Sequence, residues 1–183
     1  MRKLFLAAAL MVASPALSTG LKIEVAGEAN GVITIDLLED VAPKHVEQIA
    51  ALAAEGKYDG VAFHRVIDGF MAQTGDVVNG KIAGGNMAMA GTGGSERADL
   101  RAEFSDIPYE RGVVGMARSQ NPHSANSQFF IMFREYPSLN GQYTVVGRVS
   151  AGLEVLDAIK RGKGRNGAVI GAPDYMKSVT VTE

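Results

Sequence analysis

The 183-residue sequence contains no cysteine and no tryptophan, and only 7% of its residues are aromatic. Without cysteine no disulfide can hold the fold, but a single domain of this length buries roughly 70% of the surface that its unfolded chain exposes, which is enough for a core. The lack of free thiols suits an oxidising compartment and is equally compatible with the cytosol. With 46% hydrophobic and 21% charged residues, the composition is that of an ordinary globular domain.

The sequence also lacks an apolar run of the roughly 20 residues that a membrane-spanning helix needs. The N-terminal run from Leu4 to Val12 is far shorter, follows two basic residues and precedes the small-residue segment 14–18. This order is typical of a secretory signal peptide. We therefore expect residues 1–18 to be a leader, cut after Ser18 or, as the second candidate, after Ala16, and the protein to be periplasmic. A buried N-terminal helix and a retained anchor are the alternatives.

Charge of neither sign dominates, since 18 basic and 20 acidic residues give a formal net charge of −2. Loss of the leader with Arg2 and Lys3 leaves 16 basic and 20 acidic residues, a net charge of −4. A mildly acidic domain is a poor match for nucleic acid or anionic membrane surfaces, so we expect neither as a stable partner. The histidines His45, His64 and His123 lack ligand spacing, so no metal site is predicted.

Short apolar and β-branched segments, separated by Gly, Pro, Asn and Ser, predict a mainly β fold. Residues 22–25 and 32–38 alternate in polarity, and the Asn-Gly pair before the second segment predicts a hairpin. Further strands are expected at 61–67, 113–117, 128–133, 144–149 and 178–182. Helical spacing of apolar residues predicts two helices, one from Pro43 to a stop at Gly56 and one at Leu153 to Lys160. This pattern favours one closed antiparallel barrel over alternating βαβ units.

The segment from Phe63 to Asp76 places one arginine near an Asp-Gly turn between two strand-like stretches. Alternation puts Phe63 and Arg65 on one face, with His64 and Val66 on the other. The return stretch adds Phe70, Met71 and Gln73. Arg65 is thereby set beside a Phe, a Met and an amide. Taken alone, the segment favours the plainer interpretation, in which Arg65 pairs with a nearby carboxylate and the aromatic rings fill the core.

Two more blocks, 112–118 with 126–131 and then 139–149, complete a pattern with the first. The three blocks in this order resemble the cyclophilin family of peptidyl-prolyl isomerases, and the resemblance runs from about residue 22 to 183. It implies one isomerase domain at 19–183, a closed antiparallel eight-stranded β-barrel capped by two α-helices, and a substrate groove on the outer surface.

The resemblance further implies that Arg65 is the catalytic residue and accelerates rotation about X-Pro bonds without a covalent step, a cofactor or a metal. The implied substrate-binding residues are Phe70, Met71, Gln73, Ala117, Arg118, Gln128, Phe130, Leu139 and Tyr143. The implied partners are unfolded or partly folded proteins with exposed X-Pro segments, and a monomer is expected. The rival interpretation is a non-catalytic peptide-binding module or holdase chaperone.

The sequence departs from the family pattern in three places. Ser138 stands where many members carry tryptophan, which argues against sensitivity to cyclosporin, and Tyr143 stands where histidine is common. Residues 77–95, rich in Gly, Met, Ala and Asn, predict a surface loop that is longer than in short members. The G-x-G-x-x-G pattern at 162–167 follows a predicted helix instead of a strand, so we interpret it as a helix stop and turn.

Overall fold

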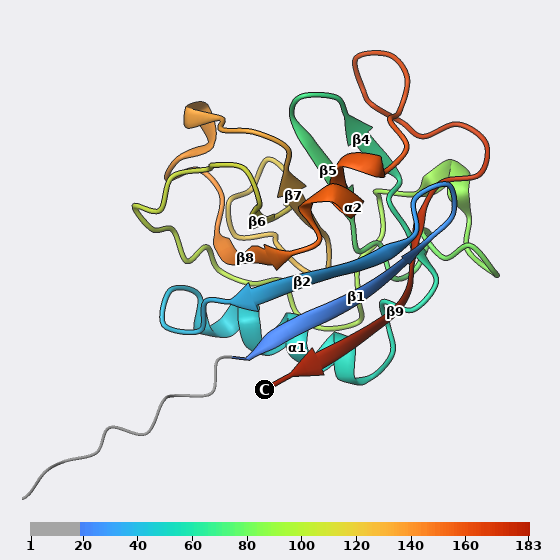
Figure 1. Ribbon diagram of the computed structural model, residues 1–183. Helices are drawn as coiled ribbons and strands as arrows, with labels where there is room; N and C mark the ends of the chain where they lie inside the picture. The colour runs from blue at the N-terminus through green and yellow to red at the C-terminus, as the bar shows by residue number, and fades with distance from the viewer. Residues whose placement is uncertain (1–18) are drawn as a thin grey trace, which may run out of the picture.

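The computed structural model describes residues 19–183; the predicted leader at 1–18 lies outside the described residues. The described strands form one antiparallel sheet in the order β3-β9-β1-β2-β8-β6-β7-β5-β4, which curls around a core (Figure 1). The elements are β1 (Gly20–Ala26), β2 (Gly31–Leu37), α1 (Pro43–Ala54), β3 (Val61–Ala62), β4 (Arg65–Ile67), β5 (Met71–Thr74), η1 (Met87–Met89), β6 (Val113–Met116), β7 (Phe129–Met132), η2 (Pro137–Leu139), β8 (Val145–Ala151), α2 (Leu153–Ala158) and β9 (Tyr175–Thr182), where η marks a 3-10 turn.

The N-terminal hairpin of β1 and β2 forms as predicted. Leu21 lies opposite Ile35, and Ile23 lies opposite Ile33. All four side chains are buried, because alternation along paired strands turns a whole apolar row toward the core. β9 pairs with the other edge of β1, so the first and last strands of the described chain are neighbours (Figure 1).

The sheet is not the closed eight-stranded barrel that we predicted. The strand expected at 61–67 is divided into β3 and β4, which form the two ends of the nine-stranded sheet. Between them, the N–H of Phe63 donates to the carbonyl of Asp174 at 2.9 Å, and the carbonyl of His64 accepts from Val169 at 3.0 Å. These bonds to the C-terminal segment replace ladder bonds across the seam. The result is a curled half-barrel whose two edges are joined by the chain itself.

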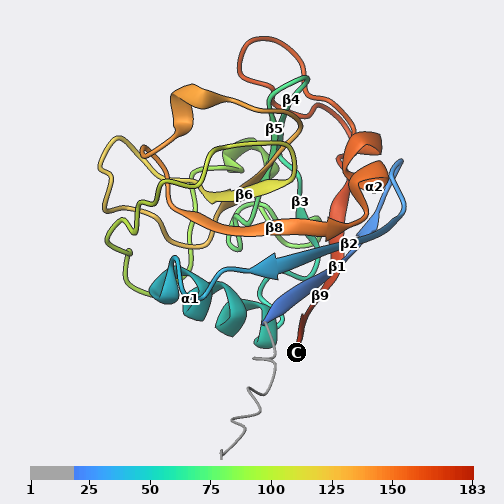
Figure 2. The same cartoon turned by 60° about the vertical axis from the view of Figure 1, so that its left-hand side comes forward.

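Helix α1 covers one end of the curled sheet and packs against β9 (Figures 1 and 2). Pro43 is its first residue, and Gly56, with a φ of 66°, follows its end, as the sequence predicts. The helix places Ile49 and Leu52 in the core. Within residues 19–183, no helix has both the length and the apolar character that crossing a membrane requires.

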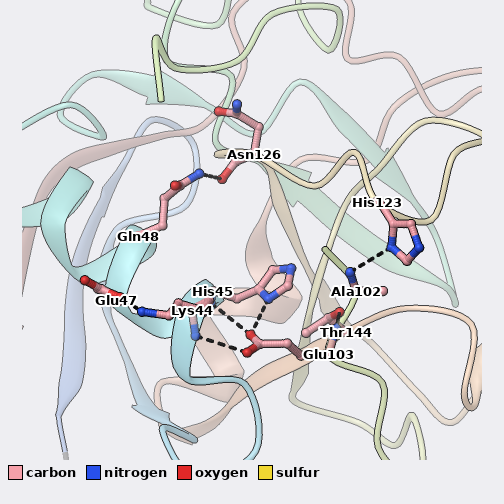
Figure 3. A network of polar contacts seen from close by, with 9 residues as sticks. All are labelled: Lys44, His45, Glu47, Gln48, Ala102, Glu103, His123, Asn126 and Thr144. Carbon is pink, nitrogen blue, oxygen red and sulfur yellow. Dashed lines mark hydrogen bonds and ion pairs between the residues drawn. The ribbon is translucent and has the colours of Figure 1, made fainter. Parts of the chain in front are cut away.

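The N-terminus of α1 is capped by a residue from a distant loop (Figure 3). The side chain of Ala42 makes no cap, and the Glu103 carboxylate accepts instead from the N–H groups of Lys44 at 3.2 Å and His45 at 3.1 Å. His45 Nδ1 lies 2.6 Å from the same carboxylate. Burial raises the pKa of Glu103, but these hydrogen bonds outweigh it and lower the pKa overall. Because the N–H of Glu103 also donates to Thr144 Oγ1 at 3.0 Å, the helix is tied to the segment before β8.

Helix α2 is shorter than predicted, since it ends at Ala158 and not at Lys160. Ile159 has an extended backbone, with φ −58° and ψ 129°. The N–H of Lys160 donates at 2.7 Å to the buried carboxylate of Asp174, which draws the chain away from the helix axis.

Buried side chains form two clusters on opposite sides of β5, β6 and β7. The inner cluster, between the sheet and α1, includes Ala72 and Ile131. The outer cluster contains Met71, Tyr109, Val113, Phe130, Met132 and Val145. Because successive strand residues point to opposite faces, the sequence neighbours Phe130 and Ile131 belong to different clusters. Two residues of the outer cluster, Met71 and Phe130, line the candidate site.

Candidate active site

One row of residues crosses the outer side of four strands. Arg65 of β4 lies opposite Gln73 of β5, Gln73 lies opposite Phe130 of β7, and Phe130 lies opposite Gly115 of β6. Met71 precedes Gln73 by two positions and therefore lies on the same face. Antiparallel pairing thus brings together residues from distant parts of the chain.

The turn between β4 and β5 forms where predicted. The N–H of Phe70 donates to the carbonyl of Ile67 at 3.0 Å, and Gly69 has a φ of 63°, in the region that favours glycine. The predicted face of Phe63 was wrong: it is fully buried in the inner cluster, whereas Arg65 faces outward. Phe63 lies in the break between β3 and β4, where the alternation of a continuous strand does not apply.

The Arg65 guanidinium is half-buried and held at two of its three nitrogens. Nε donates to the carbonyl of Asn166 at 3.0 Å, and Nη1 donates to Gln73 Oε1 at 3.0 Å. Among residues 19–183, no carboxylate lies within 4.0 Å of Arg65 and Nη2 has no hydrogen-bond acceptor, so the structural ion pair is excluded there. Burial lowers the pKa of Arg65, but a guanidinium keeps its charge in proteins. The site therefore holds a fixed cation with N–H groups to donate.

A cavity of about 160 Å³ lies beside this cation, several times the ~30 Å³ that a water molecule occupies in the liquid. It is lined by Arg65, Phe70, Met71, Gln73, Ala117, Arg118, Phe130, Leu139 and Tyr143. The remaining predicted residue, Gln128, lines an adjoining groove of about 520 Å³ that shares Gln73, Ala117 and Arg118 with the cavity. The structure thus brings all ten predicted residues together in two adjoining depressions.

Phe130 is fixed between two tyrosines. The Tyr109 ring stacks on it with centroids 5.7 Å apart and planes at 23°, and the Tyr143 ring meets it edge-on at 5.7 Å and 88°. Gly115 makes room for this packing, because a Cβ there would lie 2.7 Å from Phe130 Cζ and overlap Tyr109 Oη. Burial raises the pKa of Tyr109 well above its ordinary value, so the ring stays neutral.

Arg118 holds the rim of the cavity. Its Nε and Nη2 donate to the carbonyl of Gln142 at 3.2 and 2.9 Å, and its Cζ lies 4.4 Å from the centroid of the Tyr143 ring. The N–H of Ala117 donates to the carbonyl of Gln128 at 2.9 Å, which continues the pairing of β6 with β7. Within residues 19–183 the backbone N–H and C=O of Arg118 form no hydrogen bond, so they are available to an extended peptide.

Sequence reasoning missed three contributors to the site. Tyr109 lies in an irregular segment without a periodic signal. Tyr136 stacks on Phe70 with centroids 4.5 Å apart and likewise lies between recognised blocks. Asn166, whose carbonyl holds Arg65, belongs to the turn at 162–167, and the glycines of that turn were the available signal. Gly167, with a φ of 65°, leaves no space for a Cβ against Ile67.

The fold and the site together define a class of protein. In the part of the chain that the structure describes, a small cavity with a partly apolar wall lies beside a cation without a counter-ion and adjoins backbone groups that are free to pair. Such a cavity fits one ring of an extended peptide. Within residues 19–183, no cluster of three or more His, Asp or Glu side chains could hold a metal ion. The arrangement is suited to binding a peptide beside a fixed hydrogen-bond donor.

The chain belongs to the cyclophilin type peptidyl-prolyl cis-trans isomerase family, whose model matches residues 21–181. It is 56% identical over 153 residues to a probable peptidyl-prolyl cis-trans isomerase of Brucella suis, covering 83% of this chain and 78% of that protein. A peptidyl-prolyl cis-trans isomerase of Helicobacter pylori is 39% identical over 136 residues, or 72% of this chain and 76% of the other. The chain is accordingly an enzyme that interconverts cis and trans peptidyl-prolyl bonds.

Solved structures agree with this assignment. A cyclophilin type isomerase of Cryptosporidium parvum superposes with a TM-score of 0.76 at 26% identity, covering 91% of this chain and 98% of that one. A structure of the same protein in the presence of the dipeptide ala-pro gives a TM-score of 0.75 at 27% identity and covers 90% of this chain and 99% of that one.

Proposed function

We propose that Arg65 is the catalytic donor and that the cavity beside it holds the proline ring of the bond that rotates. The observation that carries the proposal is the position of a charged guanidinium, with Nη2 unpaired among residues 19–183, at the edge of a cavity that has apolar side chains on part of its wall. Phe70, Met71, Phe130 and Leu139 supply the apolar wall. Gln73 holds the guanidinium in place through its side-chain oxygen.

The chemistry requires no proton transfer and no covalent intermediate. The barrier is the partial double bond of the amide, about 18–20 kcal/mol, so unaided X-Pro rotation takes roughly tens to hundreds of seconds. Twisting the C–N bond localises the lone pair on the prolyl nitrogen, which becomes a better hydrogen-bond acceptor. A fixed guanidinium therefore stabilises the twisted state more than either planar state, and only such differential binding accelerates the reaction. Each 1.36 kcal/mol removed from the barrier increases the rate about tenfold.

The cavity and the neighbouring backbone bind different parts of the substrate. The apolar walls hold the pyrrolidine ring while the carbonyl side of the bond rotates. The N–H and C=O of Arg118, which have no partner within the described residues, can pair with the extended segment before proline, as in strand addition. Main-chain pairing makes little demand on sequence, which suits unfolded or partly folded proteins with exposed X-Pro segments as substrates.

Substitution of Arg65 tests the proposal. We expect Arg65→Ala to fold and to lose about a hundredfold in kcat/KM on a proline peptide, because removing one preorganised donor typically has an effect of that size. Arg65→Lys should also be impaired, since a lysine lacks the planar fork that reaches both Gln73 and the substrate. Wild-type activity in the alanine variant, measured in a protease-coupled assay, would refute the mechanism. Suppression of aggregation without rate enhancement by the wild type would instead indicate a holdase.

We further propose that residues 1–18 export the enzyme to the periplasm, where it acts as a monomer. The basic start, short apolar run and small residues of this segment support the proposal. Cell fractionation followed by N-terminal sequencing tests it. A periplasmic protein that begins at Thr19 is expected, and a cytosolic protein that retains Met1 would contradict it.

A further inference from the structure

One buried carboxylate organises the long loop that follows β5. Asp76 is 0% exposed and accepts four backbone hydrogen bonds at 2.8–3.1 Å. The donors are Val78 and Asn79 at Oδ1 and Gly91 and Gly93 at Oδ2. Burial raises the pKa of Asp76, but the four bonds outweigh it and lower the pKa overall, so the group is a carboxylate. It fixes both ends of the loop between residues 78 and 93.

The same two glycines lead from the loop to the active site. Gln128 Nε2 donates to the carbonyls of Gly91 at 3.1 Å and Gly93 at 2.7 Å. Gln128 Oε1 accepts from Gln73 Nε2 at 3.0 Å, and Gln73 Oε1 accepts from Arg65 Nη1 at 3.0 Å. A continuous series of hydrogen bonds, the relay, therefore connects the carboxylate of Asp76 to the guanidinium of Arg65.

The direction of every bond in the relay is set by its ends. A guanidinium can only donate, so Gln73 must turn Oε1 toward Arg65 and Nε2 toward Gln128. A carboxylate can only accept, so the loop N–H groups face Asp76 and the loop carbonyls are left to face Gln128. Rotating either glutamine amide by 180° would place like groups together at both of its ends. Such chains also polarise one another, which strengthens the whole series.

We propose that Asp76 is a positioning residue for catalysis, which holds Arg65 in register with the proline cavity through the loop glycines, Gln128 and Gln73. The inference rests on the proposed role of Arg65. It explains why Arg65 needs no direct counter-ion among residues 19–183: the negative charge is supplied at a distance, and Nη2 remains available for the substrate. The loop is thus part of the catalytic support.

Asp76→Asn tests the relay, because the asparagine keeps the shape but turns an NH₂ group toward backbone donors. We expect kcat/KM on a proline peptide to fall about tenfold, within the range that coupled positions show, mainly through kcat. The NMR signals of the Arg65 guanidinium should shift and broaden in the folded variant. Asp174→Asn is the matched control: this carboxylate is equally buried and accepts two backbone bonds outside the relay. The control should lower stability and leave the Arg65 signals in place.

A double-mutant cycle separates the relay from a merely structural role. Once Gln73→Ala has broken the relay, Asp76→Asn should reduce kcat/KM by less than about twofold, because coupled sites are not additive. If Asp76→Asn does not fold, Gln128→Glu replaces it, since the variant puts an acceptor against the loop carbonyls and leaves Asp76 intact. An equal loss in both backgrounds, or unchanged Arg65 signals with full activity in Asp76→Asn or Gln128→Glu, would overturn the proposal. Loss of activity in Arg65→Ala would still support the proposed function in that case.

Discussion

The two faces of β5, β6 and β7 are built from alternating residues of the same strands, but only the outer face borders an open cavity. On the inner face, Phe129 and Ile131 are fully enclosed between the sheet and α1. On the outer face, Met71 and Phe130 are also buried, but the side chains around them leave a cavity of about 160 Å³ open beside Arg65. The period of the strand thus separates the inner core from the proposed binding cavity within single segments of four residues.

The difference between the two faces predicts whether a substitution changes the free energy of unfolding or the activity. A protein interior is packed as densely as an organic crystal, so a lost inner side chain leaves a void and reduces the free energy of unfolding. A lost side chain at the outer rim changes the shape of a space that is already open. We expect inner substitutions to reduce stability and outer ones to reduce activity per folded molecule.

The largest effect is expected for Phe129→Ala, which removes a ring that meets Tyr58 edge-on with centroids 5.6 Å apart. Phenylalanine-to-alanine changes in cores lower the free energy of unfolding by about 3–5 kcal/mol. Leu139→Ala, at the partly exposed rim on η2, should instead lower kcat/KM several-fold at nearly unchanged stability. Urea denaturation and a proline-peptide assay measure both, and similar profiles for the two variants would abolish the distinction between the faces.

Gly115→Ala should cause a smaller loss that affects both properties. The new methyl group would overlap Tyr109 Oη and lie 2.7 Å from Phe130 Cζ, so one or both rings must move, and Phe130 lines the cavity. Overpacking of this kind lowers stability by about 1–3 kcal/mol. Gly147→Ala is the control, since its methyl group would meet Ile35 Cγ2 and the Asp36 carbonyl at 2.8 Å, away from the cavity. Only Gly115→Ala should reduce activity per folded molecule, and equal activity in the two variants would show that Phe130 does not shape the cavity.

Most of the fold was predictable from local signals. The hairpin of β1 and β2 follows from alternation, and α1 follows from Pro43, helical spacing and Gly56. The split of the predicted strand at 61–67 was not predictable, because it depends on hydrogen bonds to Asp174 and Val169, which are distant in the sequence. Local pattern therefore identifies a strand but not where its partner changes.

In the candidate site, too, the local sequence pattern did not reveal contacts between distant segments. The cavity residues were found through the family resemblance of three blocks, and the structure brings them together. Tyr109 was missed because it lies in an irregular segment without a periodic sequence pattern. The carbonyl of Asn166 was missed because a backbone acceptor in a turn does not depend on the side chain. The role of Asp76 was equally invisible, because it depends on four backbone groups of a loop without sustained secondary structure.

Glu103→Gln extends the comparison to pH, because this cap lies outside the cavity and should affect stability alone. The lowered pKa of Glu103 means that its contribution is present above the unfolded value near 4.5 and is lost as the pH falls through the lower folded value. We expect the variant to be about 1 kcal/mol less stable at pH 7, a typical value for a lost cap, with the difference shrinking toward pH 3. Thermal unfolding across this range measures it, with the exposed Glu47→Gln as the control. A difference that persists at low pH would show that the carboxylate charge is not its source.

Tyr143→Phe is expected to have the smallest effect and asks whether the rim acts by shape or by its polar tip. Within residues 19–183 the Tyr143 hydroxyl donates no hydrogen bond, whereas the ring meets Phe130 edge-on and lies 4.4 Å from the Arg118 guanidinium carbon. Both contacts use the ring and persist with phenylalanine. We therefore expect kcat/KM to stay within about twofold of the wild type, because the substitution keeps the ring and both of its contacts. A loss of tenfold or more would mean that the hydroxyl contacts the substrate, and the outer face would then bind by polar recognition as well as by the shape of its cavity.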